Sequence, residues 1–122
     1  MDQSQTQPMI EGAPLIAPST TDHPLYDSVV EACRTVYDPE IPVNIFDLGL
    51  IYTIAIDDTD AVRVIMTLTA PGCGMGEVLV DEVRSKLELI PTIAEADVDL
   101  VFDPPWGRHM MSEAARLETG MF

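Results

Sequence analysis

Hydrophobic residues recur along this chain with two different spacings, and these spacings predict where its helices and strands lie. Between residues 24 and 37 apolar side chains stand three or four positions apart, which is typical of one face of a helix. Asp22 is placed to cap this helix, and Pro24 suits its first turn. The same spacing returns over residues 74–89, where Pro91 ends it. The two predicted stripes consist of Tyr26, Val29, Val30, Cys33 and Tyr37, and of Met75, Leu79, Val83, Leu87 and Ile90.

Three segments alternate between apolar and polar residues, as half-buried strands do. Residues 50–57 and 61–69 are separated by a short acidic turn, which predicts an antiparallel hairpin. Residues 94–102 form the third predicted strand, with Val98, Leu100 and Phe102 facing inward. In the second strand one face is predicted to carry Val62, Val64, Met66 and Leu68, and the other to carry Arg63, Ile65, Thr67 and Thr69.

The two long helices need a common apolar surface, so we predict a two-layer α/β (α+β) domain in the order α-β-β-α-β-α. Its three-stranded mixed sheet is covered on one face by helices, and the last strand runs parallel to the second. A short helix over residues 113–118, capped by Ser112 and stopped near Gly120, closes the domain. Residues 1–20 show no periodicity and contain three prolines, so they are predicted to form a flexible tail ahead of a domain at 21–122.

The charge of the chain narrows its possible partners. Twenty-one acidic residues against six basic ones give a net charge of −15, which disfavours nucleic acid and anionic membrane surfaces. No apolar run approaches the roughly 20 residues that span a bilayer, and the N-terminus lacks the pattern of a signal peptide. We therefore expect a cytoplasmic protein. In that reducing compartment its two cysteines are not expected to form a structural disulfide.

Cys73 stands where the second strand gives way to the following helix, after Pro71-Gly72. The free amides and positive dipole end of a helix N-terminus stabilise a thiolate, and the neighbouring glycines give the sulfur little cover. Cys73 is thus a candidate metal ligand or nucleophile. The alternative is a buried cysteine in a tight turn. Cys33 lies on an apolar helix stripe and is assigned to packing.

Other candidate residues lie in the loops. Asp38, Glu40 and Asp47 either bind a hard cation, accept a partner's cations, or only solvate and cap their loop. The hydroxyls of Thr67 and Thr69 lead toward Cys73, or belong to ordinary strand residues. Trp106 is either a plug on the core or a lid near the cysteine. His109 is either the base of a Cys–His pair or an exposed loop residue.

Four motifs together resemble the small iron–sulfur protein maturation domains that include SufT and the PaaD protein of phenylacetate degradation. The resemblance covers about residues 24–120. Glycine follows Cys73, where some members of this family have proline, and this departure loosens the turn without removing the thiol. The SufT-like branch is the closer one. The motifs are Asp38-Pro-Glu-Ile-Pro42, Asp47-Leu-Gly-Leu-Ile-Tyr52, Met66-Thr-Leu-Thr-Ala-Pro-Gly-Cys73, and Pro104-Pro-Trp106 with Met110-Met-Ser112.

The resemblance implies the α-β-β-α-β-α fold and a role in assembling or delivering iron–sulfur clusters, with Cys73 as the functional thiol and metal ligand. The residues that fall on the family's other motif positions are Asp38, Glu40, Asp47, Thr67, Thr69 and Trp106. The expected partners are client apoproteins and other iron–sulfur assembly proteins. A second copy of the chain is a further possible partner, because a cluster normally needs four thiolates and this chain offers one.

Three functions follow from these residues. The first is a non-enzymatic maturation factor in which Cys73 transiently ligates iron or a cluster, or engages a client. The second is a thiol enzyme with Cys73 as nucleophile and His109 as base, which requires a third group to orient the imidazole. The third is an acidic adaptor that binds client apoproteins while Cys73 serves only its turn.

Overall fold

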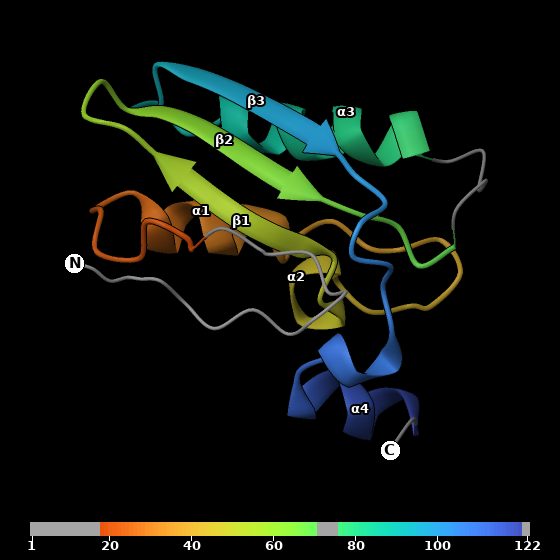
Figure 1. Ribbon diagram of the computed structural model, residues 1–122. Coiled ribbons are helices and arrows are strands. Elements are labelled where there is room, and N and C mark those ends of the chain that lie inside the picture. Colours follow the sequence, from red (N-terminus) through yellow and green to blue (C-terminus); the bar gives the residue numbers. More distant parts are fainter. Residues whose placement is uncertain (1–17, 71–75, 121–122) are drawn as a thin grey trace.

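The computed structural model describes residues 18–70 and 76–120, which form a sheet with helices packed on it (Figure 1). β1 (Ile51–Ile56) pairs antiparallel with β2 (Ala61–Met66), and β2 pairs parallel with β3 (Glu95–Leu100). The strand order is β1-β2-β3. The predicted three-stranded mixed sheet is confirmed, as is the order of the main elements.

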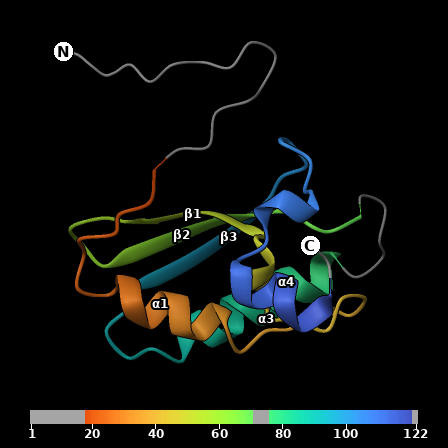
Figure 2. The ribbon, with the colours of Figure 1, turned by 90° about the horizontal axis from the view of Figure 1, so that it is seen from below.

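Two helices, α1 (Tyr26–Cys33) and α3 (Gly76–Glu88), cover one face of the sheet, as Figure 2 shows. Alternate residues of each strand point toward these helices, because side chains change face at every position of a strand. The core therefore lies between the two layers, as the apolar pattern predicts. Its buried members include Val29, Cys33, Ile54, Ile56, Val62, Val64, Met66, Leu79, Val83, Leu87, Ala96 and Val98.

α1 is shorter than the predicted helix over residues 24–37. Asp22 does not cap it: the N-cap residue is Leu25, whose amide donates to His23 Nδ1 at 3.0 Å. At the other end the chain turns, and Val36 rather than Tyr37 enters the core. Tyr37 is 57% exposed because it has left the helix and forms an isolated bridge with Asn44.

A four-residue helix, α2 (Ile45–Leu48), contains Asp47, which the sequence predicts to lie in a loop. The Asn44 side chain caps it by accepting from the Asp47 amide at 2.9 Å. Long-range bonds hold this turn in place, since the Ile45 amide donates to the Val36 carbonyl at 2.8 Å. A further short turn, η1 (Arg108–Met110), precedes the last helix.

The last two strands end earlier than predicted. β2 stops at Met66, so Thr67 does not continue the predicted strand face of Arg63 and Ile65, and it is 1% exposed. β3 stops at Leu100, and Phe102 is 47% exposed instead of facing inward. The prediction for α4 (Glu113–Thr119) is confirmed, with Ser112 Oγ accepting from the Ala115 amide at 3.1 Å and Gly120 ending the helix in the left-handed region.

Residues 18–20 are the part of the predicted tail that the structure describes. The Thr20 amide donates to the Ile54 carbonyl at 2.8 Å, and Ser19 Oγ accepts from the Ile54 amide at 3.0 Å. Thr20 Oγ1 accepts from the Ile56 amide at 3.1 Å. Ser19 and Thr20 therefore belong with the sheet, because they satisfy backbone groups on the outer edge of β1. Residues 1–17 lie outside the described part, and their tail-like character stays a prediction.

Candidate functional site

Cys73 lies in the segment 71–75, outside the described residues, but the two ends of that segment are placed. The chain enters it after Ala70 and leaves it at Gly76, the first residue of α3. Gly76 is buried, and a side chain there would press on Leu68 and Leu100 at 3.2 Å. Gly76, the residue that follows this segment, thus lies where the end of β3 meets the start of a 13-residue helix.

Cys33 is a packing residue, as its position on an apolar stripe predicts. Its side chain is fully buried between α1 and the rest of the core. Burial raises the pKa of the Cys33 thiol to about 12, because the thiolate would lose its hydration. At neutral pH this cysteine is therefore a thiol that neither ligates a metal nor attacks an electrophile.

The contrast between the two cysteines predicts different alkylation rates. In native protein at pH 7, iodoacetamide is expected to modify Cys73 while Cys33 stays unmodified, since a pKa of about 12 leaves a thiolate fraction of roughly one in 10⁵. Peptide mapping by mass spectrometry gives both rates from one sample. Unfolding in denaturant should make the two cysteines equally reactive. A native Cys33 that reacts as fast as Cys73 would reverse the assignment.

Asp38 and Glu40 do not form a cation site with Asp47. Asp38 is nearly buried, and its Oδ2 accepts from the Glu40 amide at 2.9 Å and the Ile41 amide at 2.8 Å. This carboxylate holds the proline-containing loop closed, and Glu40 points into solvent. Within residues 18–70 and 76–120, no three His, Cys, Asp or Glu side chains gather as a metal ion would require.

Asp47 ties α2 to two other parts of the chain. Its Oδ2 accepts from Asn44 Nδ2 at 3.0 Å, and its Oδ1 lies 3.7 Å from the Arg34 guanidinium. The Arg34 guanidinium also sits over the Phe46 ring, 5.1 Å from its centre. The Asp47 carbonyl accepts from the Ser112 amide at 2.8 Å, which places the start of α4 beside α2 (Figure 1). Asp47 thus serves as a structural carboxylate.

Trp106 also attaches the C-terminal segment to α2. Its Nε1 donates to the Leu48 carbonyl at 2.8 Å, and its ring packs against the core. Of the two roles considered for it, the packing role is the one that the described residues support. Next to this bond, Gly49 takes the left-handed conformation, and a side chain there would collide with the Met110 carbonyl.

Tyr52 is the residue at which three of the four motifs meet. A register shift between Ile51 and Thr53 makes Tyr52 an extra residue in β1, and such a bulge redirects a side chain. Its hydroxyl donates to the Pro104 carbonyl at 2.6 Å and lies 3.6 Å from Met110 Sδ. Burial raises the pKa of Tyr52, and a hydrogen bond with the Thr67 side chain opposes that rise. We call Tyr52, Thr67, Pro104 and Met110 the Tyr52 cluster.

The Tyr52 cluster borders a cavity of about 330 Å³ lined by Phe46, Gly49, Ile51, Tyr52 and Met110. A neutral phenol whose proton is already donated to a carbonyl is neither a base nor a metal ligand. Its action is to clamp the Pro104 segment and the end of β2 together. The Thr67 amide donates to the Leu50 carbonyl at 2.9 Å. This strand-like pairing lies shortly before residues 71–75, the segment that carries Cys73.

The remaining candidates stand apart from this cluster. Thr69, which follows β2 in the sequence, is half-buried. His109 is exposed in η1, and in the described residues its ring has neither a hydrogen bond nor an ion pair that would orient it. Its backbone carbonyl, rather than its ring, is bonded, to the Arg116 side chain at 2.9 Å. The orienting group that a Cys–His pair requires is therefore missing from the described part.

The family model described as "Iron-sulfur cluster assembly protein" matches residues 26–100, which include Cys73 and three of the four motifs. The chain belongs to this family. This match and the named relatives below confirm the predicted resemblance to SufT-like proteins. None of the helices in residues 18–70 and 76–120 is long and apolar enough to cross a membrane.

Named relatives of this family member agree with the family model. An Fe-S protein maturation auxiliary factor of Porphyromonas gingivalis is 47% identical over 77% of this chain and 90% of its own length. The Fe-S protein maturation auxiliary factor SufT of Staphylococcus aureus is 42% identical over 70% of this chain and 98% of its own length. A solved structure from Bacillus anthracis, a domain of unknown function called DUF59, has a TM-score of 0.73 at 32% identity and covers 79% of this chain and 92% of its own.

Proposed function

We propose that this protein is an auxiliary factor in the maturation of iron–sulfur proteins, in which Cys73 transiently ligates iron or a cluster or engages the client, without acting as an enzyme. The observation that carries the proposal is the family match over residues 26–100, a span that contains Cys73 immediately ahead of α3. Relatives are named maturation auxiliary factors, which is the name of a helper rather than of a catalyst.

The chemistry of the donor set supports a transient role. Thiolates are the usual ligands of iron–sulfur clusters, and four are normally required. The chain has two cysteines, and one of them, Cys33, is fully buried in the core, where burial raises its pKa to about 12. A single available thiolate holds a cluster weakly, so cluster that is bound here passes readily to a partner with a complete set of ligands. The cluster is thus cargo.

In this proposal, residues at the two ends of the segment 71–75 position it for binding iron or a cluster. The Tyr52 cluster fixes the end of β2, and Gly76 fixes the start of α3 against Leu68 and Leu100. Asp38 and Asp47 are occupied by bonds within their own loops. In this proposal Thr67 and Thr69, which follow β2, and Trp106, bonded to Leu48, are supporting residues and not further ligands, and Glu40 is exposed with no structural role assigned.

Anaerobic reconstitution tests the proposal. Apo protein is incubated with ferrous iron, sulfide and dithiothreitol and is then desalted. The iron and sulfide bound per chain are measured, and the absorbance of the charge-transfer bands reports the cluster. Wild type is expected to retain cluster, and Cys73→Ser is expected to lose at least about nine-tenths of it, because a hydroxyl is a poor ligand for this iron. Cys33→Ala is the matched control and should load as wild type does.

Two results would contradict this function. Loading in wild type that does not depend on Cys73 would remove the thiol from the mechanism, and if there is also no thiol turnover, the acidic adaptor is favoured. Turnover of a thiol substrate by metal-free wild type that is lost in His109→Ala would favour the thiol enzyme.

A further inference from the structure

β3 is an edge strand whose outward backbone groups have no partner in the described part of the chain. The Val101 amide donates to the Met66 carbonyl at 2.8 Å, so alternate residues of β3 direct their amides and carbonyls toward β2. The residues between them, Val98 and Leu100 among them, direct theirs outward. The opposite edge of the sheet differs, because Ser19 and Thr20 bond to β1 there. An open edge of this kind accepts a further strand.

A groove runs along this open edge between β3 and α3. Its volume is about 490 Å³, and its apolar part is made by Val80, Val98 and Leu100. Val80 and Leu100 are each only partly buried, so they offer apolar surface that this chain does not cover. A strand added beside β3 would direct every second side chain into this groove. The groove ends at Leu100, where Gly76 begins α3, three residues after Cys73 in the sequence.

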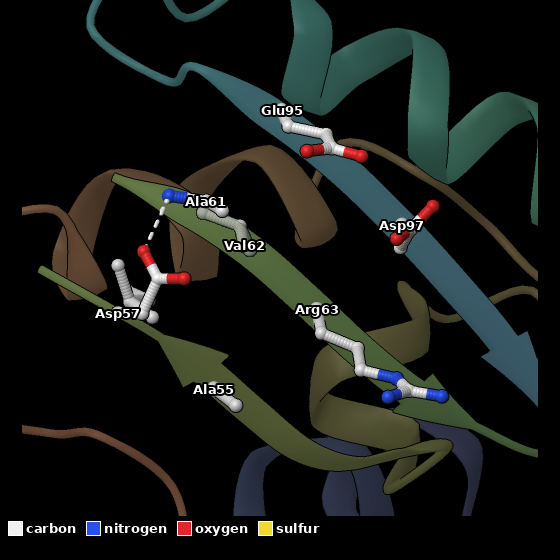
Figure 3. Close-up of a pocket in the computed structure, with 8 residues that line it drawn as sticks. Ala55, Asp57, Ala61, Val62, Arg63, Glu95 and Asp97 are labelled. Atoms are coloured by element: carbon white, nitrogen blue, oxygen red, sulfur yellow. Dashed lines mark hydrogen bonds between the residues drawn. The ribbon is translucent and has the colours of Figure 1, made fainter. Parts of the chain in front are cut away.

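The charges around the edge are acidic on both sides. In Figure 3 Glu95 and Asp97 stand on the face of β3 that the helices leave open. Neither has an ion-pair partner in the described residues, nor does Glu77 at the groove. The nearby cations are already engaged: Arg63 with Asp99, and Arg84 with Asp81 at 3.0 Å.

This charge distribution selects the kind of strand that fits. A second copy of the chain, pairing β3 with β3, would bring two acidic rows together, each on a chain of net charge −15. A strand whose outward side chains are lysine or arginine would instead meet Glu95 and Asp97. Its other face would place apolar side chains beside Val80 and Leu100, in a groove that charged residues of α3 and β3 also line.

We propose that β3 is a docking edge that binds an extended protein segment as a fourth strand, and that this segment alternates apolar residues with lysine or arginine. The inference rests on the proposed function in one respect only, which is that the segment belongs to a client apoprotein. Docking here would hold the client beside the start of α3, next to the segment that carries the thiol. Edge pairing, groove filling and charge pairing each contribute to binding.

Peptide titration tests the docking edge on the full apo chain. The probe is a capped ten-residue peptide that alternates valine and lysine. One control peptide replaces lysine with glutamate, and another carries N-methyl groups on the amides that would pair with β3. We expect binding of the valine–lysine peptide, with shifts and slowed amide exchange in NMR at Val98 and Leu100. Neither control peptide should bind with measurable affinity, since one repels the acidic rows and the other lacks donors.

Two protein variants distinguish binding of the peptide at β3 from its general electrostatic attraction to an acidic protein. Asp97→Lys should weaken the valine–lysine peptide by roughly three- to tenfold, because it reverses one charge at the edge. Glu118→Lys, on α4, makes the same change of net charge elsewhere and should leave the affinity as in wild type. Cys73→Ser should also bind as wild type does, so a failure of cluster loading does not affect this test.

The proposal is overturned if the N-methylated peptide binds as well as its parent, or if both lysine variants weaken binding equally. Perturbed amides confined to elements other than β3 and α3 would also reject it. Self-association of the free apo chain that slows amide exchange at Val98 and Leu100 would show that a second copy, and not a client segment, occupies the edge.

Discussion

Replacing Gly49 with alanine is expected to lower the free energy of unfolding by about 3 kcal/mol, since the left-handed conformation costs a non-glycine residue about 1–2 kcal/mol before any collision. Gly49 ends α2 with φ at 89°. An added Cβ would meet the backbone carbonyl of Met110, which has no side-chain freedom with which to move away. The substitution would push η1 from α2 and strain the neighbouring bond between Trp106 and Leu48.

Gly120→Ala provides the matched control for this substitution. Gly120 also has a positive φ, of 74°, but a Cβ there meets nothing within 4 Å. Its replacement should cost about 1 kcal/mol, which is the conformational term alone. Urea denaturation followed by circular dichroism measures both values. If the two variants lose the same stability, the close approach of Met110 to Gly49 contributes nothing, and this account of the glycine in the Asp47 motif is wrong.

Residues whose neighbours in sequence decide their structure could be predicted. The stripe through Leu79, Val83 and Leu87 predicted α3 because burial of one helix face follows from spacing alone. Ser112 and Gly120 predicted the ends of α4 because a cap and a left-handed stop act within one turn. The hairpin of β1 and β2 followed in the same way from alternation and a short turn.

Residues whose structure depends on distant bonds could not be predicted. Tyr37 continues the apolar spacing of α1, but the bond between Ile45 and Val36 draws the chain into a loop, and Val36 takes the buried position. Thr67 continues the alternation of β2, but the strand has ended and the Leu50 carbonyl receives its amide. The spacing of apolar residues within one segment cannot indicate a hydrogen-bond partner that lies in a different segment.

The same distinction between local and distant contacts applies to the residues of the candidate site. Asp47 and Trp106 stand out from their motifs, but the motifs do not indicate that the Asp47 carboxylate bonds to Asn44 or that Trp106 bonds to Leu48. Tyr52 was present in a motif and was interpreted only as a strand former. Its role depends on Pro104, 52 positions away, and on Thr67 at the end of another strand. The one available signal was that Tyr52 ends a motif whose other polar residue, Asp47, was already a candidate.

Cluster-loaded protein is expected to elute as a dimer, or as a complex with a client, whereas the apo protein elutes at its own smaller size. A two-iron cluster needs four ligands, and under the proposed function each chain supplies one thiolate, from Cys73, because Cys33 is fully buried. Oxygen atoms are weaker ligands for this iron, and the Asp47 carboxylate is already bonded to Asn44 and Arg34. The missing ligands must therefore come from outside the chain.

Size-exclusion chromatography with light scattering and iron counting, under anaerobic conditions, measures this directly. Iron should elute with the larger species at about one two-iron cluster per two chains, and a chelator should return the protein to the apo position, because an incompletely ligated cluster is labile. Cys33→Ala should behave as wild type, and Cys73→Ser should remain at the apo position throughout. A cluster held by a monomer without outside thiol, and retained in Cys73→Ser, would contradict both the sharing of the cluster and the choice of Cys73 as its ligand.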